Sequence, residues 1–408
     1  MAFQDWVSLL TLGLTLSGVA VGRYPGLRMN RATIALVGAT VVVLLGAITL
    51  EQAYRAVDWS TIVLLFSMMV LNINLRLAGF FRIVSARVIG VARTPRQLLF
   101  MIVLASGVLS AVFLNDSVVL MFTPLVVEML KALRRDPVPY LLALATAANV
   151  GSAATIIGNP QNMLIGMACK ISFGQFAGTL APVAGVGLLI CYVVVVVIYR
   201  REFAENSFHP VVSHEVRTFR PLLIKSMVAF ALMLVALVAG VPIPLAALGA
   251  ASILLVTRRI KPARVFTELD WSLLVFFASL FVVTHAVNVL IVEGMRGGID
   301  RFAAGSGLAT LSVISVVLSN LVSNVPAVLL LKPVASAWPD PPLAWLTLAM
   351  ATTFAGNLTL LGSVANLIVA ESARTRGVRL SFVEYLKAGV PITVLTVAVG
   401  VGWLTWVA

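Results

Sequence analysis

The sequence has few charged residues and very few cysteines. Of its 408 residues, 11% are Asp, Glu, Lys or Arg, whereas a soluble globular domain carries about 25%. This shortage excludes a soluble enzyme. The two cysteines, Cys169 and Cys191, show no metal-ligand spacing. Neither a disulfide framework nor a zinc site is indicated, and we predict no metal site.

Motifs for hydrolysis and nucleotide use are also missing. The chain contains no His-Glu-x-x-His, no Gly-x-Ser-x-Gly and no Gly-Lys dipeptide. A zinc protease, a serine hydrolase and a phosphate-binding loop need these residues. We therefore predict that the chain is not an enzyme, has no catalytic residues and uses no cofactor other than a coupling Na⁺. The first six residues lack the basic segment of a cleavable signal peptide, so we expect the first span to direct insertion.

Long apolar runs dominate what remains. Hydrophobic residues make up 60% of the chain, and the mean hydropathy is +1.05. Many runs approach the roughly 17–25 residues that cross a bilayer core as a helix. These runs predict an all-α polytopic membrane protein with about ten transmembrane helices. We expect the spans at 6–22, 32–50, 59–78, 140–170, 174–199, 221–240, 242–257, 271–292, 343–370 and 388–406.

Two further apolar segments, 97–130 and 306–335, are each interrupted by polar residues in the middle. Each is either a bent span or a re-entrant hairpin. If both are hairpins, most of the 29 Lys and Arg residues fall on one face of the membrane, which the positive-inside rule makes cytoplasmic. We therefore predict two hairpins, a location in the inner (plasma) membrane, and both termini on the non-cytoplasmic side. Basic residues confined to short connections also argue against a nucleic-acid partner.

The second half of the chain resembles the first. The predicted repeats are 1–205, with hairpin 97–130, and 221–408, with hairpin 306–335; a cytoplasmic linker at 206–220 joins them. An odd number of crossings in each copy forces opposite orientations, and inverted repeats with broken helices are typical of secondary transporters. The matches, in order, are Asp58-Trp59-Ser60 with Asp270-Trp271-Ser272, Asn115 with Asn324, and Thr155 to Asn162 with Thr359 to Asn366.

Four polar clusters lie where the apolar segments are interrupted. Two are the hairpin tips, and two are the stretches 149–162 and 356–366 within predicted spans. Gly158 and Pro160 favour an unwound helix, whose free carbonyls bind cations and whose new N-terminus binds anions. The alternative is that these small and polar residues only pack helices together. Because the clusters occur in repeat-related pairs, we favour binding sites.

Asp116 is the only carboxylate that we expect near the middle of the membrane. Such a group is costly unless it is paired, protonated or bound to a cation, which indicates function. The alternative is a hydrogen bond that ties the hairpin tip. Lys332 is expected nearer the mouth of the second hairpin, extending toward water rather than contacting substrate. For His285, a hydrogen bond between helices is favoured over a proton relay.

These clusters resemble the ion transporter superfamily, which includes arsenite-efflux permeases, divalent anion/sodium symporters, citrate–metal symporters and certain sodium/proton antiporters. The resemblance implies that tips and unwound spans form the binding sites, that the hairpins move in an elevator-like step, and that the protein is a homodimer. The branch of the superfamily stays open. The motifs are Asn115-Asp116 ahead of Thr123-Pro124, Ile157 to Asn162, Ser323-Asn324-Val325-Pro326, and Gly356 to Asn366.

The resulting hypothesis is a secondary active, Na⁺- or H⁺-coupled transporter of a small inorganic or organic anion or oxyanion across the bilayer. A sodium/proton antiporter or an arsenite-efflux permease, with Asp116 as the titrating site, is the alternative, and a channel is a third possibility. Residues predicted to contact substrate are Asn115, Ser117, Asn162, Ser323, Asn324, Thr359, Ser363 and Asn366. Residues predicted to hold the coupling ion are Asn115, Asp116, Thr155, Gly158, Asn159, Asn357 and Gly362.

Overall fold

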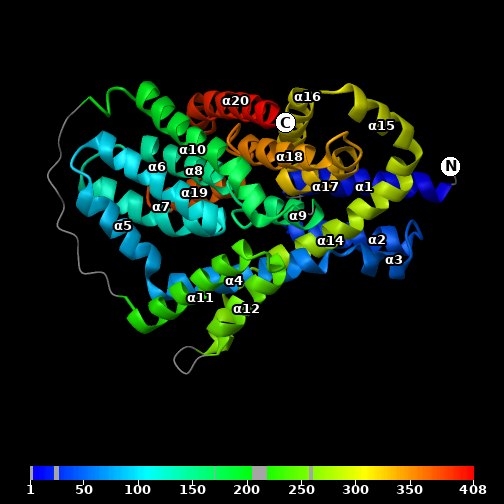
Figure 1. Ribbon diagram of the computed structural model, residues 1–408, viewed down its shortest axis with the longest axis horizontal. Coiled ribbons are helices and arrows are strands. Elements are labelled where there is room, and N and C mark those ends of the chain that lie inside the picture. Colours follow the sequence, from blue (N-terminus) through cyan, green and yellow to red (C-terminus); the bar gives the residue numbers. More distant parts are fainter. Residues whose placement is uncertain (1–2, 23–26, 170, 205–217, 257–260) are drawn as a thin grey trace.

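The computed structural model describes residues 3–22, 27–169, 171–204, 218–256 and 261–408, and their regular secondary structure is entirely helical (Figure 1). Within these residues, six helices are long and apolar enough to cross a membrane, and shorter apolar helices accompany them. The prediction of an all-α polytopic membrane protein is therefore confirmed. Most of the predicted linker 206–220 lies outside the described residues, so the predicted repeat boundaries stay a prediction.

The helices follow the same order in the two halves, so that each label in the first half corresponds to the label ten higher in the second. The first series is α1 (Phe3–Val21), α2 (Arg31–Leu44), α3 (Leu50–Ala56), α4 (Trp59–Ala78), α5 (Phe80–Val91), α6 (Pro95–Val112), α7 (Asn115–Ala132), α8 (Pro137–Ser152), α9 (Pro160–Ala168) and α10 (Phe173–Ile198). The second series is α11 (Arg220–Val238), α12 (Ile243–Leu255), α13 (Pro262–Thr267), α14 (Trp271–Val287), the turns η1 (Asn288–Val292) and η2 (Glu293–Met295), α15 (Arg296–Gly305), α16 (Leu308–Val322), α17 (Asn324–Ser336), α18 (Pro341–Ala355), α19 (Val364–Arg374) and α20 (Phe382–Val407).

The Asp-Trp-Ser motif begins the fourth helix of each series. The Asp58 carboxylate accepts hydrogen bonds from the backbone N–H groups of Ser60 and Thr61, at 3.0 and 3.2 Å. Asp270 does the same for Leu273 at 3.0 Å. An Asp at this position satisfies N–H groups that the first helical turn leaves without partners. The sequence match between the halves therefore reflects the same helix start.

The two hairpins and the two interrupted spans form as predicted. Helices α6 and α7 make the first hairpin, which turns before Asn115, and α16 and α17 make the second, which turns at Ser323. The predicted span 140–170 consists of α8 and α9, separated by residues 153–159. The span 343–370 consists of α18 and α19, separated by residues 356–363.

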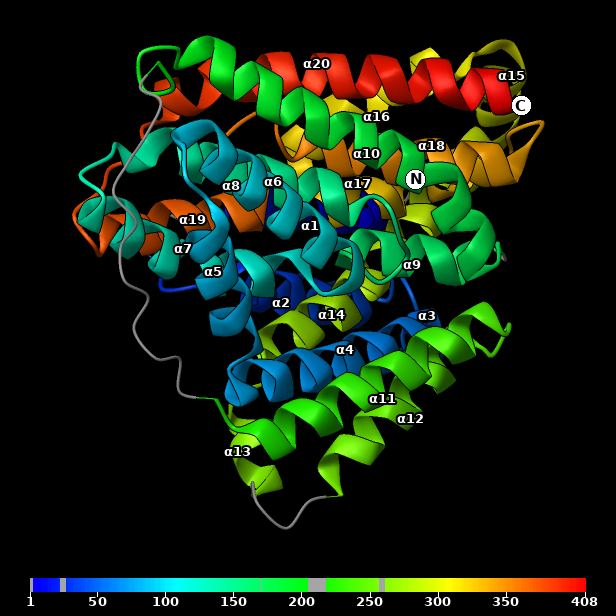
Figure 2. The same ribbon diagram turned by 60° about the vertical axis from the view of Figure 1, so that its left-hand side comes forward.

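The two series interlock. Helix α2 packs on α14, and α12 packs on α4, so each half covers the fourth helix of the other. Helices α4, α11 and α12 lie together on one side of the molecule, whereas α10 and α20 lie side by side on the opposite side (Figure 2). The hairpins and broken helices fill the space between these groups. This arrangement brings the four helix breaks toward the middle of the molecule, where the first break is buried and the second is partly exposed at Leu361.

Four short helices, α3, α5, α13 and α15, were not predicted from the sequence. They occupy connections that the hydropathy pattern assigns to loops. In α3, the Thr49 hydroxyl accepts from the Gln52 backbone N–H at 3.1 Å, and the Gln52 side chain accepts from the Thr49 N–H at 2.7 Å. Such a capping box stabilises a short helix locally. Hydropathy over a membrane-length window does not detect elements of this size.

Candidate functional site

Both hairpin tips and both helix breaks meet at one cavity of about 470 Å³. Six helices begin at its wall, namely α2, α7, α9, α14, α17 and α19. Its polar lining residues are Asn30, Arg31, Asn115, Asp116, Gln161, Asp270, Ser272, Ser323, Asn324 and Ser363. This candidate cavity has a volume within the usual range for small-ligand sites.

The helix N-termini give this cavity a positive character. Each N-terminus carries about half a positive charge together with backbone N–H groups that lack a partner within the helix. Helices α7 and α17, which start at the hairpin tips, have no side-chain cap hydrogen bond. In front of α17, Ser323 has a φ of +79°, a strained conformation for a residue with a side chain. An anion in the cavity is therefore favoured by the backbone.

Three ionisable side chains from distant segments also face this cavity. Arg31 begins α2, Asp116 lies in the first turn of α7, and Asp270 caps α14. Asp116 also borders a smaller cavity of about 230 Å³ between α4, α5, α7 and α14. There Arg76 and Glu268 form an ion pair. The carboxylate of Asp116 can therefore be reached from two hollows.

In the first break, two asparagines hold the unwound backbone. Asn159 caps α9 by accepting from the Asn162 N–H at 2.8 Å. The Asn162 amide donates to the carbonyl oxygens of Ser152 and Thr155, at 3.1 and 3.0 Å. The Gly158 carbonyl accepts from the backbone N–H of Asn115 at 3.0 Å. The first break and the first hairpin tip are thus joined directly.

The second break repeats this arrangement. The Asn366 amide donates to the carbonyl oxygens of Gly356 and Thr359, at 2.7 and 3.1 Å. Ser363 caps α19 by accepting from the Ala365 N–H at 3.2 Å. The bonded carbonyls are those that the sequence repeat pairs with Ser152 and Thr155. Asn162 and Asn366 therefore perform the same structural task.

Asn149 of α8 lies at the centre of these elements. Its amide donates to the Oδ1 atoms of Asn357 and Asn366, at 2.9 and 3.0 Å. Its own Oδ1 accepts from the Asn115 amide and from the Ser363 hydroxyl, each at 3.1 Å. One buried side chain thus connects the first hairpin tip to the second break.

The predicted site residues fall into two groups. Asn115, Asp116, Ser323, Asn324 and Ser363 line the candidate cavity, and Ser117 lines the smaller one. The others lie behind the cavity wall and hold the breaks and hairpins in shape. This second group contains Thr155, which donates to the Ala111 carbonyl, together with Gly158, Asn159, Asn162, Asn357, Thr359, Gly362 and Asn366.

The residues that sequence reasoning left out are Arg31, Asn149, Asp270 and Gln161. Arg31 was counted only as a charge in a connection, and Asp270 only as part of the repeat. Gln161 is buried in the cavity wall and donates to the Thr353 hydroxyl at 3.5 Å. Asn149 stood in a polar cluster but was not singled out. A polar residue inside an apolar segment, next to a predicted break, is the signal that identifies it.

Comparisons with known proteins agree with this architecture. Residues 18–355 match the family described as citrate transporter, CitMHS. The silicon efflux transporter LSI3 of Oryza sativa subsp. japonica is 32% identical over 452 residues, which cover 92% of this chain and 93% of that protein. A 46 kDa membrane protein of Mycobacterium leprae is 29% identical over 91% of this chain and 92% of its own length. The putative transporter arsB of Dictyostelium discoideum is 25% identical, covering 92% and 87%.

Two solved structures share the fold. The YdaH transporter of Alcanivorax borkumensis superposes with a TM-score of 0.64 at 12% identity, covering 100% of this chain and 98% of that one. The Neisseria gonorrhoeae efflux pump MtrF gives a TM-score of 0.61 at 15% identity, covering 99% and 94%. At these identities the likeness shows the fold alone. The family match and the close relatives place the chain, a multi-pass membrane transporter, in the citrate transporter family.

Proposed function

We propose that the protein is a secondary active transporter that carries a small anion or oxyanion, coupled to Na⁺ or H⁺. The observation that supports it is the convergence of helix N-termini on one cavity that also contains Arg31. Broken helices whose N-termini face the substrate are the usual way in which transporters bind an anionic group in a membrane. Arg31 adds a full charge and several donors in a fixed geometry.

Asp116 is our candidate for the coupling site. It shares the candidate cavity with Asp270 and Arg31, so two carboxylates face one guanidinium. The excess negative charge favours a Na⁺ ion or a proton beside the anion. The bound cation offsets the negative charge that the anion adds to the site. We propose that the hairpins then move in an elevator-like step, because a site with less net charge crosses an apolar barrier at lower cost.

The experiment measures uptake of a test solute by the purified protein in liposomes. Citrate is one test solute because it gives the family its name, and silicic acid another because a relative exports silicon. We expect uptake of one such solute that responds to an imposed Na⁺ or pH gradient. Asp116→Asn should lose the response to the gradient and retain exchange of labelled for unlabelled solute. Asp340→Asn, which keeps an exposed helix cap far from the cavity, is the control.

Cation exchange or arsenite efflux, with Asp116 as the titrating group, is the second candidate. The pair of carboxylates in one cavity is the observation that favours it. Na⁺ or H⁺ movement without any added anion, abolished by Asp116→Asn, would establish the exchanger and overturn anion transport; arsenite movement driven only by protons would indicate efflux. A steady current in planar bilayers would instead indicate a channel.

Orientation and assembly are further parts of the proposal. The Lys and Arg distribution favours an orientation with both termini on the non-cytoplasmic side. Labelling of single cysteines introduced near each end, from one side of intact cells, tests this orientation. The resemblance to dimeric transporters predicts a homodimer, which the mass of the purified protein in nanodiscs tests.

A further inference from the structure

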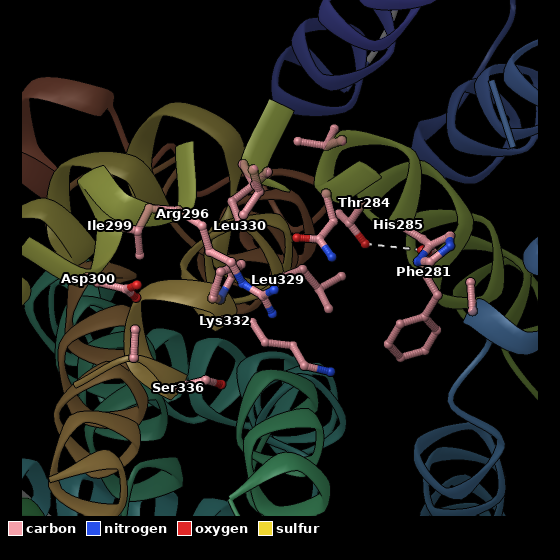
Figure 3. A pocket seen from close by; sticks show the side chains of 16 residues that line it. Phe281, Thr284, His285, Arg296, Ile299, Asp300, Leu329, Leu330, Lys332 and Ser336 are labelled. Carbon is pink, nitrogen blue, oxygen red and sulfur yellow. Dashed lines mark hydrogen bonds between the residues drawn. The ribbon is translucent and has the colours of Figure 1, made fainter. Parts of the chain in front are cut away.

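A second cavity of about 500 Å³ lies between the C-terminal half of α14 with η1, the helix α15 and the hairpin helix α17 (Figure 3). It is separate from the candidate cavity. Phe277 lines the candidate cavity, whereas Phe281, one turn later on α14, lines the second. Both rings are buried, and their centroids lie 6.4 Å apart. This aromatic pair lies between the two cavities along α14.

The repeat relates the second cavity to the small hollow beside Asp116. That hollow lies between α4, α5 and α7, whose counterparts are α14, α15 and α17. In the register that aligns the Asp-Trp-Ser motifs, Asn72 of the hollow corresponds to Thr284 of the second cavity. The second cavity therefore borders the second hairpin, α16–α17, in the way that the small hollow borders the first hairpin, α6–α7.

The charges in these two related places differ. In the small hollow, Arg76 is paired with Glu268. In the second cavity, Arg296 and Lys332 extend into the open space (Figure 3). Neither cation makes an ion pair or a side-chain hydrogen bond with any described residue. Asp300, the one carboxylate among the described lining residues, also has no such partner.

Lys332, which is expected to extend toward water near the mouth of the hairpin, is exposed in the structure. It lines this cavity together with Arg296, which is also exposed. The two cations outnumber the one carboxylate among the described lining residues, Asp300, so the cavity carries a positive potential that attracts an anion. Asn288 and His285 border the same space and can supply neutral donors. The combination is that of an anion site.

We propose that this second cavity binds an oxyanion of the phosphate type, with Arg296 and Lys332 as its charged ligands and Asn288 as a neutral donor. The planar guanidinium donates to two oxygens at once, and the ammonium group binds a third as a point charge. Free phosphate and a lipid headgroup share this chemistry. The site lies outside the candidate cavity and does not depend on which solute is transported.

The test is binding of radiolabelled inorganic phosphate to the full-length protein in phosphatidylcholine nanodiscs. We expect Arg296→Gln and Lys332→Gln each to weaken binding about tenfold. Lys332→Arg, which keeps the charge, should stay within about threefold of the wild type. Arg301→Gln on the same helix is the matched control, because Arg301 is exposed, does not line the cavity and should leave binding unchanged. Equal elution and melting of all variants verify folding.

A second arm identifies the source of the oxyanion. In nanodiscs that contain phosphatidylglycerol, undiminished phosphate binding indicates a free anion, whereas competition that requires Arg296 and Lys332 indicates a headgroup. Either result supports the site. The proposal is overturned if phosphate does not bind in phosphatidylcholine nanodiscs, or if both charge variants bind it like wild type. It is also overturned if Asn324→Ala alone abolishes binding, because the anion then occupies the candidate cavity.

Discussion

The amide of Asn149 donates a hydrogen bond to Oδ1 of Asn366 at 3.0 Å, across a sequence separation of 217 residues. The two residues lie in α8 and α19, which belong to different halves of the chain. Asn366 in turn holds the carbonyls of the second break, and Asn149 also contacts the first hairpin tip. The parts of the candidate cavity are therefore mechanically connected through buried amides.

Replacing Asn149 with alanine should destabilise this connection. The change leaves the polar groups of Asn115, Asn357 and Asn366 without a partner in a buried place, and each such group costs about 1–3 kcal/mol. We expect the free energy of unfolding to fall by about 3 kcal/mol or more, measured by thermal unfolding in detergent. Asn74→Ala, which removes a bond within α4 only, should cost less. An equal loss of stability in Asn149→Ala and Asn74→Ala would contradict the central role of Asn149.

Gly158 should not tolerate a side chain. A Cβ atom there would lie 2.7 Å from the carbonyl oxygen of Ser110 and closer still to that of Ser152. Because backbone cannot move aside as a side chain can, Gly158→Ala should lower the melting temperature and abolish transport. Gly178→Ala in α10 is the control, since a Cβ there meets nothing within 4 Å. It should be neutral or slightly stabilising, because alanine favours helix. Normal transport by Gly158→Ala would show that the first break can rearrange.

Arg31 should contribute to anion affinity. Arg31→Gln removes the positive side chain of the candidate cavity, and loss of one charge-assisted contact raises the dissociation constant about tenfold or more. Titration of the transported anion against the purified protein measures this effect. Arg28→Gln, an exposed neighbour that does not line the cavity, should bind normally. If Arg31→Gln binds the anion as tightly as Arg28→Gln does, the helix N-termini alone hold the anion.

Ser323 should be strained. Its φ of +79° is a conformation that glycine adopts readily and that costs other residues about 1–3 kcal/mol. We expect Ser323→Gly to raise the free energy of unfolding by about 1 kcal/mol, measured by thermal unfolding. Ser323→Ala keeps the strained backbone and loses only the hydroxyl, so its free energy of unfolding should not rise. A gain in both variants would assign the effect to the hydroxyl instead.

The helix breaks were the most predictable part of the site. Gly, Pro and Asn within otherwise apolar segments indicated where the helices are interrupted, and the structure begins α7, α9, α17 and α19 at these points. The sequence repeat also corresponds to equivalent hydrogen bonds in the two halves. Asn162 and Asn366, paired by sequence, bond carbonyls that are paired in the same way.

The charged residues of the cavities were not predictable in the same way. Arg31, Asp116 and Asp270 come from three segments that no local pattern connects. The packing of α2 on α14 brings Arg31 near Asp270, and the position of α7 adds Asp116 to the same cavity. Lys332 and Arg296 likewise line one cavity from a hairpin helix and a separate short helix. Long-range contacts depend on how helices pack, which hydropathy and spacing do not encode.

The sequence alone determined that this protein is a helical membrane protein with two hairpins, because hydrophobic run length and backbone-breaking residues act locally. It also determined the internal repeat and the residues at the breaks. Only the tertiary structure decided which of those residues face a cavity and which hold it together, because burial depends on neighbouring helices. It likewise decided that Asn149 connects the halves and that the two cavities are separated by Phe277 and Phe281.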